Sequence, residues 1–352
     1  MYLLVIFCEY RISQLKSYVY IPFPPYFSVM VEKRTCEVDL GLDIPKDRKC
    51  SSCSGSAVIH LPYANKYMCR KHFYSHVEKR FLDTVREFKM IKKNETVALG
   101  LSGGKDSTTL LYMLHKLKSK LPYNLIAVTI DLGLDCDYNK DILDIAAKEC
   151  KLLEIQHHVF KLKDDIGFTL EGLVEKTGTR NPCSECGVAR RYLLNRHAKE
   201  LGADKLAIAH NLNDTAQTVL MNILRNEPMR LFRYNEPLVE DSKFVTRIKP
   251  FLKLPEREVV MYGKLKGLPL LDKKCCPYST YAFRSYVREE VENLEERYPG
   301  SMFKILNSFL SMQKTFKEGN STEVKMSYCK KCGEPSGAKI CKFCNLIERL
   351  KN

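Results

Sequence analysis

The sequence contains no apolar run long enough to span a membrane. The apolar stretch at residues 1–8 is much shorter than the ~20 residues that a membrane-spanning helix requires. No basic segment precedes this stretch, so it does not have the layout of a secretory signal peptide. These absences lead us to expect a cytoplasmic protein that does not bind a membrane.

The sequence also lacks the Walker A spacing, in which four residues separate a glycine from a Gly-Lys pair. It has instead Ser-Gly-Gly-Lys-Asp-Ser at 102–107, between an apolar run at 96–101 and an amphipathic helical pattern from Asp106 onward. Adjacent glycines let the backbone approach a ligand, and a helix N-terminus favours an anion. We therefore expect the loop to hold phosphates through Leu101, Ser102, Gly103, Gly104, Lys105, Asp106 and Ser107.

Acidic residues are outnumbered by basic ones, 42 against 57, which gives a formal net charge of +15. Such an excess suggests a polyanionic partner, although generic basicity is the simpler explanation. The apolar fraction of 45% is that of a globular protein. The 15 cysteines are an odd number, and many occur in Cys-x-x-Cys or Cys-x-x-His spacings, which favours metal ligation in a reducing compartment over disulfides.

Two sets of these cysteines have the spacing of structural zinc sites. A Cys-x-x-Cys pair followed by a Cys-x-x-His pair predicts a closed site of three cysteines and one histidine, and two nearby Cys-x-x-Cys pairs predict a four-cysteine site near the C-terminus. Cys36 is interpreted as a spectator. The expected zinc ligands are Cys50, Cys53, Cys69 and His72 for one ion, and Cys329, Cys332, Cys341 and Cys344 for the other.

A third pair, Cys183 and Cys186, has no second pair within zinc-finger range. We expect a helix to begin near Gly187, and its N-terminus, with Arg180, Arg190 and Arg191 nearby, to lower the thiol pKa. Cys275 and Cys276 supply further thiols. Three thiols are too few for a closed zinc site but could hold an iron–sulfur cluster; inert buried thiols are the alternative.

Strand-like and helical patterns alternate after residue 96, which predicts an α/β fold with a doubly wound parallel sheet. Ligands of such sheets bind beyond the carboxyl ends of the strands, so Ile130, Asp131 and Ala209 should converge with the loop on one nucleotide. The expected strands are 96–101, 124–131, 153–160 and 205–210, and the expected helices are 75–93, 106–117, 140–150, 164–177, 187–202, 213–226 and two within 282–316.

The order of these motifs resembles that of the tRNA 2-thiouridine synthetases of the TtuA and cytosolic thiouridylase subunit 1 type, in the PP-loop ATP-pyrophosphatase superfamily. The resemblance runs from about Cys50 to Cys344. It rests on the zinc pairs, SGGKDS at 102–107, PCSECG at 182–187, AHNLND at 209–214 and CPYS at 276–279. It implies the adenine nucleotide alpha hydrolase-like fold of that superfamily.

The resemblance implies an ATP-dependent tRNA sulfurtransferase that adenylates the C2 oxygen of a uridine and then installs sulfur. ATP and Mg²⁺ would bind at Asp106 and Asp214, with Ala209 against the adenine. The ligands of a [4Fe–4S] cluster would be Cys183, Cys186 and Cys276, the last preferred to Cys275 because the family motif is Cys-Pro-Tyr.

Two departures from the family pattern concern polar positions. Ala209 and Asn213 replace a Gly and an Asp, and Arg190 stands where a Lys is usual. Arginine does not release a proton at neutral pH, so we expect position 190 to bind phosphate rather than transfer a proton.

We expect four regions: an extension at 1–30, disordered or preceding a true start at Met30; a zinc module at 31–75; the PP-loop domain at 76–318; and a second zinc module at 319–352. The expected partners are tRNA, a second copy of the chain, and a sulfur source, either a thiocarboxylated ubiquitin-like carrier or free sulfide. The alternatives are another PP-loop enzyme, of the cytidine-thiolating or lysidine type, and a non-catalytic zinc-containing RNA-binding protein.

Overall fold

The computed structural model describes residues 47–179, 181–232, 245–271, 276, 278, 283–319, 327–334 and 336–351. The expected extension at 1–30, Cys36, Arg180 and Cys275 lie outside these residues. The expected limits of the four regions stay a prediction.

The centre of the fold is a five-stranded sheet in the order β5-β4-β3-β6-β7, and every neighbouring pair of strands is parallel. This confirms the predicted parallel sheet. The strands are β3 (Thr96–Gly100), β4 (Asn124–Asp131), β5 (Gln156–Lys161), β6 (Lys205–Ala207) and β7 (Thr246–Ile248).

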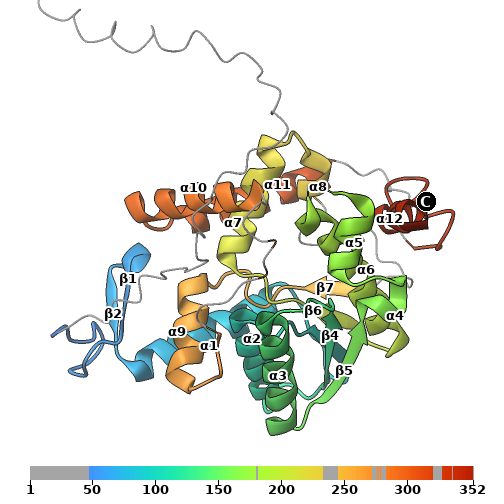
Figure 1. Ribbon diagram of the computed structural model, residues 1–352. Coiled ribbons are helices and arrows are strands. Elements are labelled where there is room, and N and C mark those ends of the chain that lie inside the picture. Colours follow the sequence, from blue (N-terminus) through green and yellow to red (C-terminus); the bar gives the residue numbers. More distant parts are fainter. Residues whose placement is uncertain are drawn as a thin grey trace, which may run out of the picture. The chain divides into compact units, whose positions relative to one another are not determined.

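Helices cover both faces of this sheet, because side chains along a strand alternate between its faces. On β3, Val97 and Leu99 pack with apolar residues of α1, α2, α3 and α9, whereas Ala98 packs on the other face with Ala198 of α6. Figure 1 shows α2 and α3 in front of the strands. The bounds are α1 (Arg70–Glu87), α2 (Lys105–Leu117), α3 (Asp137–Leu152), α6 (Pro182–Glu200) and α9 (Glu256–Lys266).

Two further apolar clusters lie outside the sheet. One joins α7, α10 and α11 around Leu306 and Phe309. The other joins α5, α6 and α12 and includes the Cys186 side chain. The elements concerned are α4 (Leu162–Ile166), α5 (Leu170–Thr177), α7 (Leu212–Leu224), α8 (Pro228–Phe232), α10 (Phe283–Arg297), α11 (Ser301–Gly319) and α12 (Lys342–Lys351).

The N-terminal part of the described chain is a small antiparallel hairpin of β1 (Ile59–Leu61) and β2 (Lys66–Met68), joined by the 3-10 turn η1 (Pro62–Ala64). It leads directly into α1, which begins at Arg70 rather than at residue 75. The hairpin's Ile59 and Leu61 are buried with Phe73 of α1 in the main core. The hairpin therefore packs on the same core as the sheet.

Two other predicted helices differ from the structure. The helix expected at 164–177 is two helices, because Gly167 ends α4 with a φ of 82°. The helix expected from Gly187 begins at Pro182, where proline is favourable, and the Asn181 side chain accepts a hydrogen bond from the backbone N–H of Ser184. The thiols of Cys183 and Cys186 therefore belong to the first turns of α6.

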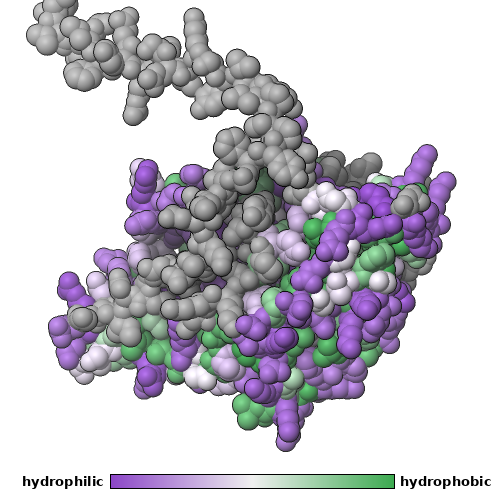
Figure 2. Space-filling model, viewed as in Figure 1, coloured by the Kyte–Doolittle hydropathy of each residue, from purple (hydrophilic) through white to green (hydrophobic). Residues whose placement is uncertain are grey.

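Among the described residues, no helix combines the length and apolar character needed to cross a membrane. In the view of Figure 2, hydrophilic side chains dominate the surface over α12.

Candidate active site

The phosphate-binding loop predicted from the sequence connects β3 to α2. Gly103 has a φ of 74°, and a Cβ atom there would lie 1.9 Å from the carbonyl oxygen of Ile142 in α3. A side chain at this position would clash with backbone, so only glycine fits both the conformation and the space. Gly104 then caps α2, which directs the helix N-terminus at the loop.

Two serine hydroxyls hold the loop in shape. The Oγ atoms of Ser102 and Ser107 lie 3.0 Å apart, and the Ser102 Oγ accepts a hydrogen bond from the backbone N–H of Gly104. The Ser107 Oγ donates to the Gly104 carbonyl at 3.0 Å. These bonds preorganise the hydroxyls and amides that an anion would contact.

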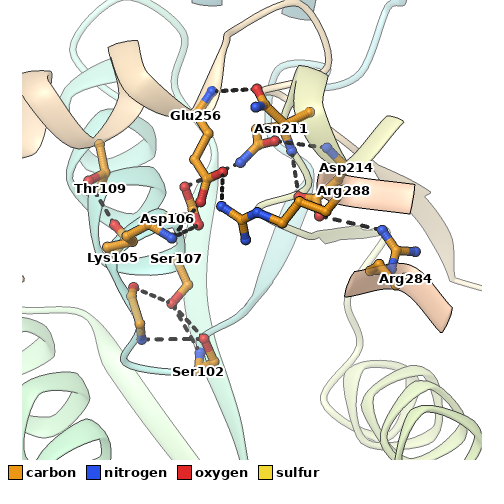
Figure 3. A network of polar contacts seen from close by, with 12 residues as sticks. Ser102, Lys105, Asp106, Ser107, Thr109, Asn211, Asp214, Glu256, Arg284 and Arg288 are labelled. Carbon is orange, nitrogen blue, oxygen red and sulfur yellow. Dashed lines mark hydrogen bonds and ion pairs between the residues drawn. The ribbon is translucent and has the colours of Figure 1, made fainter. Parts of the chain in front are cut away.

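Lys105 is held by a buried carboxylate from a distant part of the chain. Its Nζ lies 2.6 Å from Oε1 of Glu256, whose side chain is 6% exposed, and 3.4 Å from Oδ2 of Asp106. The other oxygen of Glu256 pairs with Arg288 of α10 at 2.9 Å. Figure 3 shows Glu256 between the two cations. Burial alone would lower the pKa of Lys105, but the carboxylates of Asp106 and Glu256 raise it by a larger amount. The amine therefore stays charged.

Asp106 lies among other carboxylates. Burial raises the pKa of Asp106 to about 7; Lys105 opposes this shift, and Glu256 and Asp214 add to it. Its Oδ1 accepts a hydrogen bond from the Asn211 amide at 3.4 Å. Because the pKa of Asp106 stays raised even with Lys105 nearby, a further cation such as Mg²⁺ would favour the ionised carboxylate.

Asp214 lies at the first turn of α7, beside Asp106. Asn211 and Asp214 cap α7 reciprocally, each accepting a hydrogen bond from the backbone N–H of the other at 3.0–3.2 Å. The second oxygen of Asp214 lies 3.7 Å from a guanidinium nitrogen of Arg284 in α10 (Figure 3).

The remaining nucleotide residues lie at the carboxyl ends of β4 and β6, on either side of β3. Ile130 and Asp131 end β4, and Ala209 follows β6 by two residues. The Asp131 Oδ1 accepts hydrogen bonds from the backbone N–H of Gly133 and the side chain of Asn139. Asp131 thus shapes the loop after β4.

Cys183, Cys186 and Cys276 come together although 90 residues separate the last two in sequence. The Cys186 and Cys276 side chains belong to one apolar cluster. The Cys183 thiol donates to the Tyr278 carbonyl at 3.0 Å, and Arg190 donates to the Cys186 sulfur at 2.9 Å. The trio is therefore assembled beside a guanidinium.

Two thiols of this trio, those of Cys183 and Cys276, have raised pKa values. Burial and the neighbouring Cys186 raise the pKa of Cys183, and Arg190 only partly opposes them, so the prediction of a lowered pKa is wrong for this thiol. Burial also raises the pKa of Cys276. Thiolates here therefore need a further positive charge, as a bound metal cluster would provide.

The first predicted zinc group is compact. The ligand atoms of Cys50, Cys53, Cys69 and His72 lie within 4.8 Å of one another. The Cys53 and Cys69 sulfurs are 3.7 Å apart, and the His72 Nδ1 lies 3.3 Å from the Cys50 sulfur. Tetrahedral zinc with bonds of about 2.0–2.3 Å requires sulfur–sulfur distances near ~3.8 Å, so the group fits one ion.

The second predicted zinc group has the same geometry. The sulfurs of Cys329, Cys332, Cys341 and Cys344 lie within 4.8 Å of one another, and those of Cys332 and Cys341 are 3.7 Å apart. Although burial opposes it, hydrogen bonds from backbone N–H groups, that of Cys341 foremost, lower the pKa of Cys329 to about 6. Because the metal binds the thiolate form, this donor set suits a cation.

The sequence did not indicate three charged residues of the nucleotide site: Glu256, Arg284 and Arg288. Glu256 is the first residue of α9, directly after Pro255, and such a helix start could have been recognised. Its contact with Lys105 could not, because the two residues are far apart in sequence. The two arginines lie four residues apart, on one side of α10.

Comparison with known proteins places these residues in context. A family model described as a PP-loop domain matches residues 73–295. A second model, described as 2-thiouridine synthetase TtuA, N-terminal LIM domain, matches residues 49–74. The first match contains the phosphate loop and the three central cysteines, and the second contains Cys50, Cys53, Cys69 and His72.

Full-length relatives show the same similarity. The tRNA-5-methyluridine(54) 2-sulfurtransferase of Pyrococcus horikoshii is 34% identical over 296 residues, 84% of this chain and 92% of the relative. The cytoplasmic tRNA 2-thiolation protein 1 of Chlamydomonas reinhardtii is 32% identical over 309 residues, covering 86% and 85%. The solved structure of the U34-tRNA thiolase NcsA from Methanococcus maripaludis with its [4Fe-4S] cluster superposes with a TM-score of 0.74 at 34% identity, covering 86% and 96%.

Proposed function

Because the chain belongs to the PP-loop family of 2-thiouridine synthetases and tRNA 2-thiolation proteins, we propose that it is a tRNA sulfurtransferase that makes 2-thiouridine. The observation that carries the proposal is the series of charged side chains that links the thiol trio to Asp214 of the nucleotide site. Arg191 interacts electrostatically with both Cys186 and Arg284, and Arg284 pairs with Asp214. Activation by ATP and sulfur chemistry could therefore act on one uridine.

ATP binds with its phosphates on the loop at 102–107. The Ser102 and Ser107 hydroxyls, the backbone amides at the start of α2 and the Lys105 amine face the phosphates, and Ala209 lies against the adenine. Asp106 and Asp214 hold Mg²⁺, for which carboxylate oxygens are suitable ligands. Lys105 exchanges part of its pairing with Glu256 for the phosphates.

The first chemical step is adenylation of the uracil. The C2 oxygen attacks the α-phosphorus of ATP, an O–P bond forms, and the bond from that phosphorus to the bridging oxygen of the β-phosphate breaks. Pyrophosphate leaves, and the N3 proton is lost. Lys105 and the backbone amides of the loop stabilise the charge that develops on the phosphates.

The second step replaces the activated oxygen. Hydrosulfide, supplied free or by a thiocarboxylated carrier, attacks C2 and forms a C–S bond. The C2–O bond then breaks, AMP leaves with the oxygen, and the thiol proton moves to N3 to give the 2-thioketo form. No net oxidation or reduction occurs. Arg190 is suited to hold an anionic group here, because its guanidinium lies beside the Cys186 sulfur.

The donors at the thiol site fit an iron–sulfur cluster. Three cysteines converge, and one of them lies beside the Arg190 guanidinium. The raised pKa values of Cys183 and Cys276 mean that added positive charge would favour their thiolates. Cys183, Cys186 and Cys276 would hold the cluster. When bound, a [4Fe–4S] cluster with three protein ligands offers one iron at which sulfide can be held.

Both compact groups fit zinc, since the sulfur–sulfur distance of 3.7 Å in each matches tetrahedral coordination. We assign them as structural ions that stabilise the two terminal modules. The modules and the net charge of +15 favour binding of tRNA through its phosphates. We also propose that the protein is a cytoplasmic homodimer and that its regions are 31–75, 76–318 and 319–352.

The direct test is an anaerobic reaction of the purified holoprotein with unmodified tRNA, Mg·ATP and sulfide. Nucleoside mass spectrometry should show 2-thiouridine, with one AMP formed per sulfur installed, and fragment mapping should place it at position 34 or 54. The Asp106→Ala variant should form no AMP while still binding tRNA. Thiocytidine or lysidine as the product would assign another PP-loop reaction, and tRNA binding without AMP formation would assign a non-catalytic protein.

A further inference from the structure

A pocket of about 190 Å³ lies between α6 and the C-terminal cysteine module, and we call it the α6 pocket. Arg191, Tyr192 and Asn195 line it from one face of α6, since residues three and four apart lie side by side on a helix. Arg247 of β7 and Lys342 of α12 also line the pocket. Its volume is below the ~300–1,000 Å³ of pockets for drug-sized ligands, so it can enclose only part of a nucleotide-sized group.

Cations dominate the lining of the α6 pocket. Arg191, Arg247 and Lys342 face one carboxylate, that of Glu334. In the described part of the chain, neither Arg191 nor Lys342 forms an ion pair. Arg230 and Arg284 also interact with Arg191, so like charges repel one another here. An anion at the mouth would relieve that repulsion.

Asn195 adds a second requirement. Its side chain is 3% exposed, and its Nδ2 donates to Glu334 at 3.5 Å. Among the residues that the structure describes, its Oδ1 has no hydrogen-bond partner, although buried acceptors are normally satisfied. A ligand that completes the site must therefore donate a hydrogen bond. The ionised phosphodiester of an RNA chain has no proton to donate, whereas the 2′-hydroxyl and the base N–H groups of a nucleotide can donate.

The α6 pocket is also held in shape before any ligand arrives. The rings of Tyr192 and Phe343 stack with centroids 3.7 Å apart and planes 8° from parallel. Buried Leu346 and Leu350 of α12 pack in the same cluster as Leu193 of α6. The two walls of the pocket are thus fixed to one another, so little ordering is needed on binding.

We propose that the α6 pocket binds one RNA nucleotide of the tRNA, other than the uridine that is modified. Its phosphate lies on Arg191 and Lys342, and its ribose hydroxyl or base donates to Asn195 Oδ1. This inference rests on the proposed function, because it takes tRNA as the substrate. Cys186 and Asn195 are nine residues apart on α6, about 14 Å along its axis, so the nucleotide is close to the reacting uridine.

The test measures tRNA binding by the holoprotein over a range of salt concentrations, together with steady-state thiolation. For Lys342→Gln we expect the slope of log K against log salt to become shallower by about 0.7–0.9. For Asn195→Ala we expect the Kd and KM for tRNA to rise about 3- to 10-fold without a change in that slope. In both variants kcat at saturating tRNA and ATP affinity should be unchanged.

Lys330→Gln is the matched control, because Lys330 is an exposed lysine of the same module that does not line the pocket. Lys342 is also exposed, so its variant should fold, and thermal unfolding checks that Asn195→Ala does. If the wild type thiolates tRNA and both pocket variants behave like Lys330→Gln, the inference fails and the proposed function stands. If Lys342→Gln weakens binding but folded Asn195→Ala does not, the pocket holds only phosphate, and the nucleotide assignment is wrong. A wild type that binds tRNA without thiolating it contradicts the proposed function, while the binding measurements still decide the pocket.

Discussion

The cysteines of this chain form two kinds of group that start from the same Cys-x-x-Cys spacing. Cys50 and Cys53 lie in a bend, where the Cys53 sulfur accepts a hydrogen bond from the backbone N–H of Gly55, and four ligand atoms gather within 4.8 Å. Cys183 and Cys186 lie on the first turns of α6 instead, and the described trio that they form with Cys276 is not among the groups that meet this distance. Each compact group also has a pair at a helix start, Cys69 with His72 at α1 and Cys341 with Cys344 at α12. What the trio lacks is a second pair, because Cys276 is a single cysteine distant in sequence.

This difference separates two metal chemistries. One ion requires all its ligands at the corners of a small tetrahedron, whereas a cluster distributes its thiolates over several irons. The pKa shifts do not separate the two kinds of group. In the first compact group hydrogen bonds outweigh burial and lower the pKa of Cys50 to about 6, whereas the pKa of Cys53 is raised, as are those of Cys183 and Cys276 in the trio. By geometry, the compact groups fit one ion each and the trio fits a cluster of several irons.

Removing one thiol of the trio should have the largest effect. Cys183→Ala, Cys186→Ala and Cys276→Ala should each abolish thiolation and the iron content while ATP binding and both zincs are kept. Iron analysis, mass spectrometry of tRNA and an ATP-binding assay measure these outcomes. Cys136→Ala, which changes a cysteine outside all three groups, is the matched control and should keep iron, zinc and activity. A trio variant with a normal iron content would show that the trio does not differ from the compact groups in binding a cluster.

Removing a ligand from a compact group should damage folding rather than chemistry. Because structural zinc binding supplies folding free energy of about 10 kcal/mol or more in small zinc domains, Cys344→Ala should lose one zinc and unfold the C-terminal module. Limited proteolysis should then cut within 327–351 while the PP-loop domain stays resistant. Loss of iron with retention of both zincs would show that Cys344 serves the other kind of site.

Glu256→Gln tests whether the nucleotide site is independent of both kinds of cysteine group. Losing the pairs to Lys105 and Arg288 should misplace the amine and lower kcat/KM for ATP about 10-fold. Iron and zinc contents should be unchanged. Glu289→Gln, at an exposed position of α10, is the control and should be silent in the same assay. A drop in iron content would link Glu256 to the trio instead.

The smallest effect concerns the pH dependence of stability without ligands. The folded-state pKa of Asp106, about 7, exceeds its ordinary value of 3.8, so the folded protein holds this proton more tightly than the unfolded chain. The free energy of unfolding contributed by this group therefore falls as pH rises from about 4 to about 7. Asp106→Asn should remove that loss. The variant should be more stable than the wild type by about 1–2 kcal/mol above pH 7 and should differ little from it at pH 4. Thermal melts of the nucleotide-free wild type and variant measure this difference in stability. A difference that does not grow as the pH rises would show that the pKa of Asp106 is not raised.

The sequence was sufficient for the parts of the site that depend on local chemistry. The loop at 102–107, the parallel sheet and the gathering of each four-ligand group all follow from short patterns. Cys186 and Arg190 could also have been paired, since Asn181 and Pro182 signal a helix start that makes the two residues neighbours on α6. A helix that began near Gly187 would leave Cys186 outside it, so this contact was not predicted.

Other features could not be read from local patterns. β7 has three residues and is too short to show a period. Glu256 is charged yet 5% exposed, and its burial is stable only because Lys105 and Arg288 come to it from other parts of the fold. The raised pKa of Cys183 is likewise set by tertiary burial, which outweighs the helix N-terminus and Arg190.

The distinction between the two kinds of cysteine group is tested most directly by elemental analysis of anaerobically purified, active protein. The account predicts two zincs per chain together with about four irons and about four acid-labile sulfides, and a brown colour that disappears in Cys276→Ala while the zincs remain. Full thiolation activity in colourless, iron-free protein would contradict it.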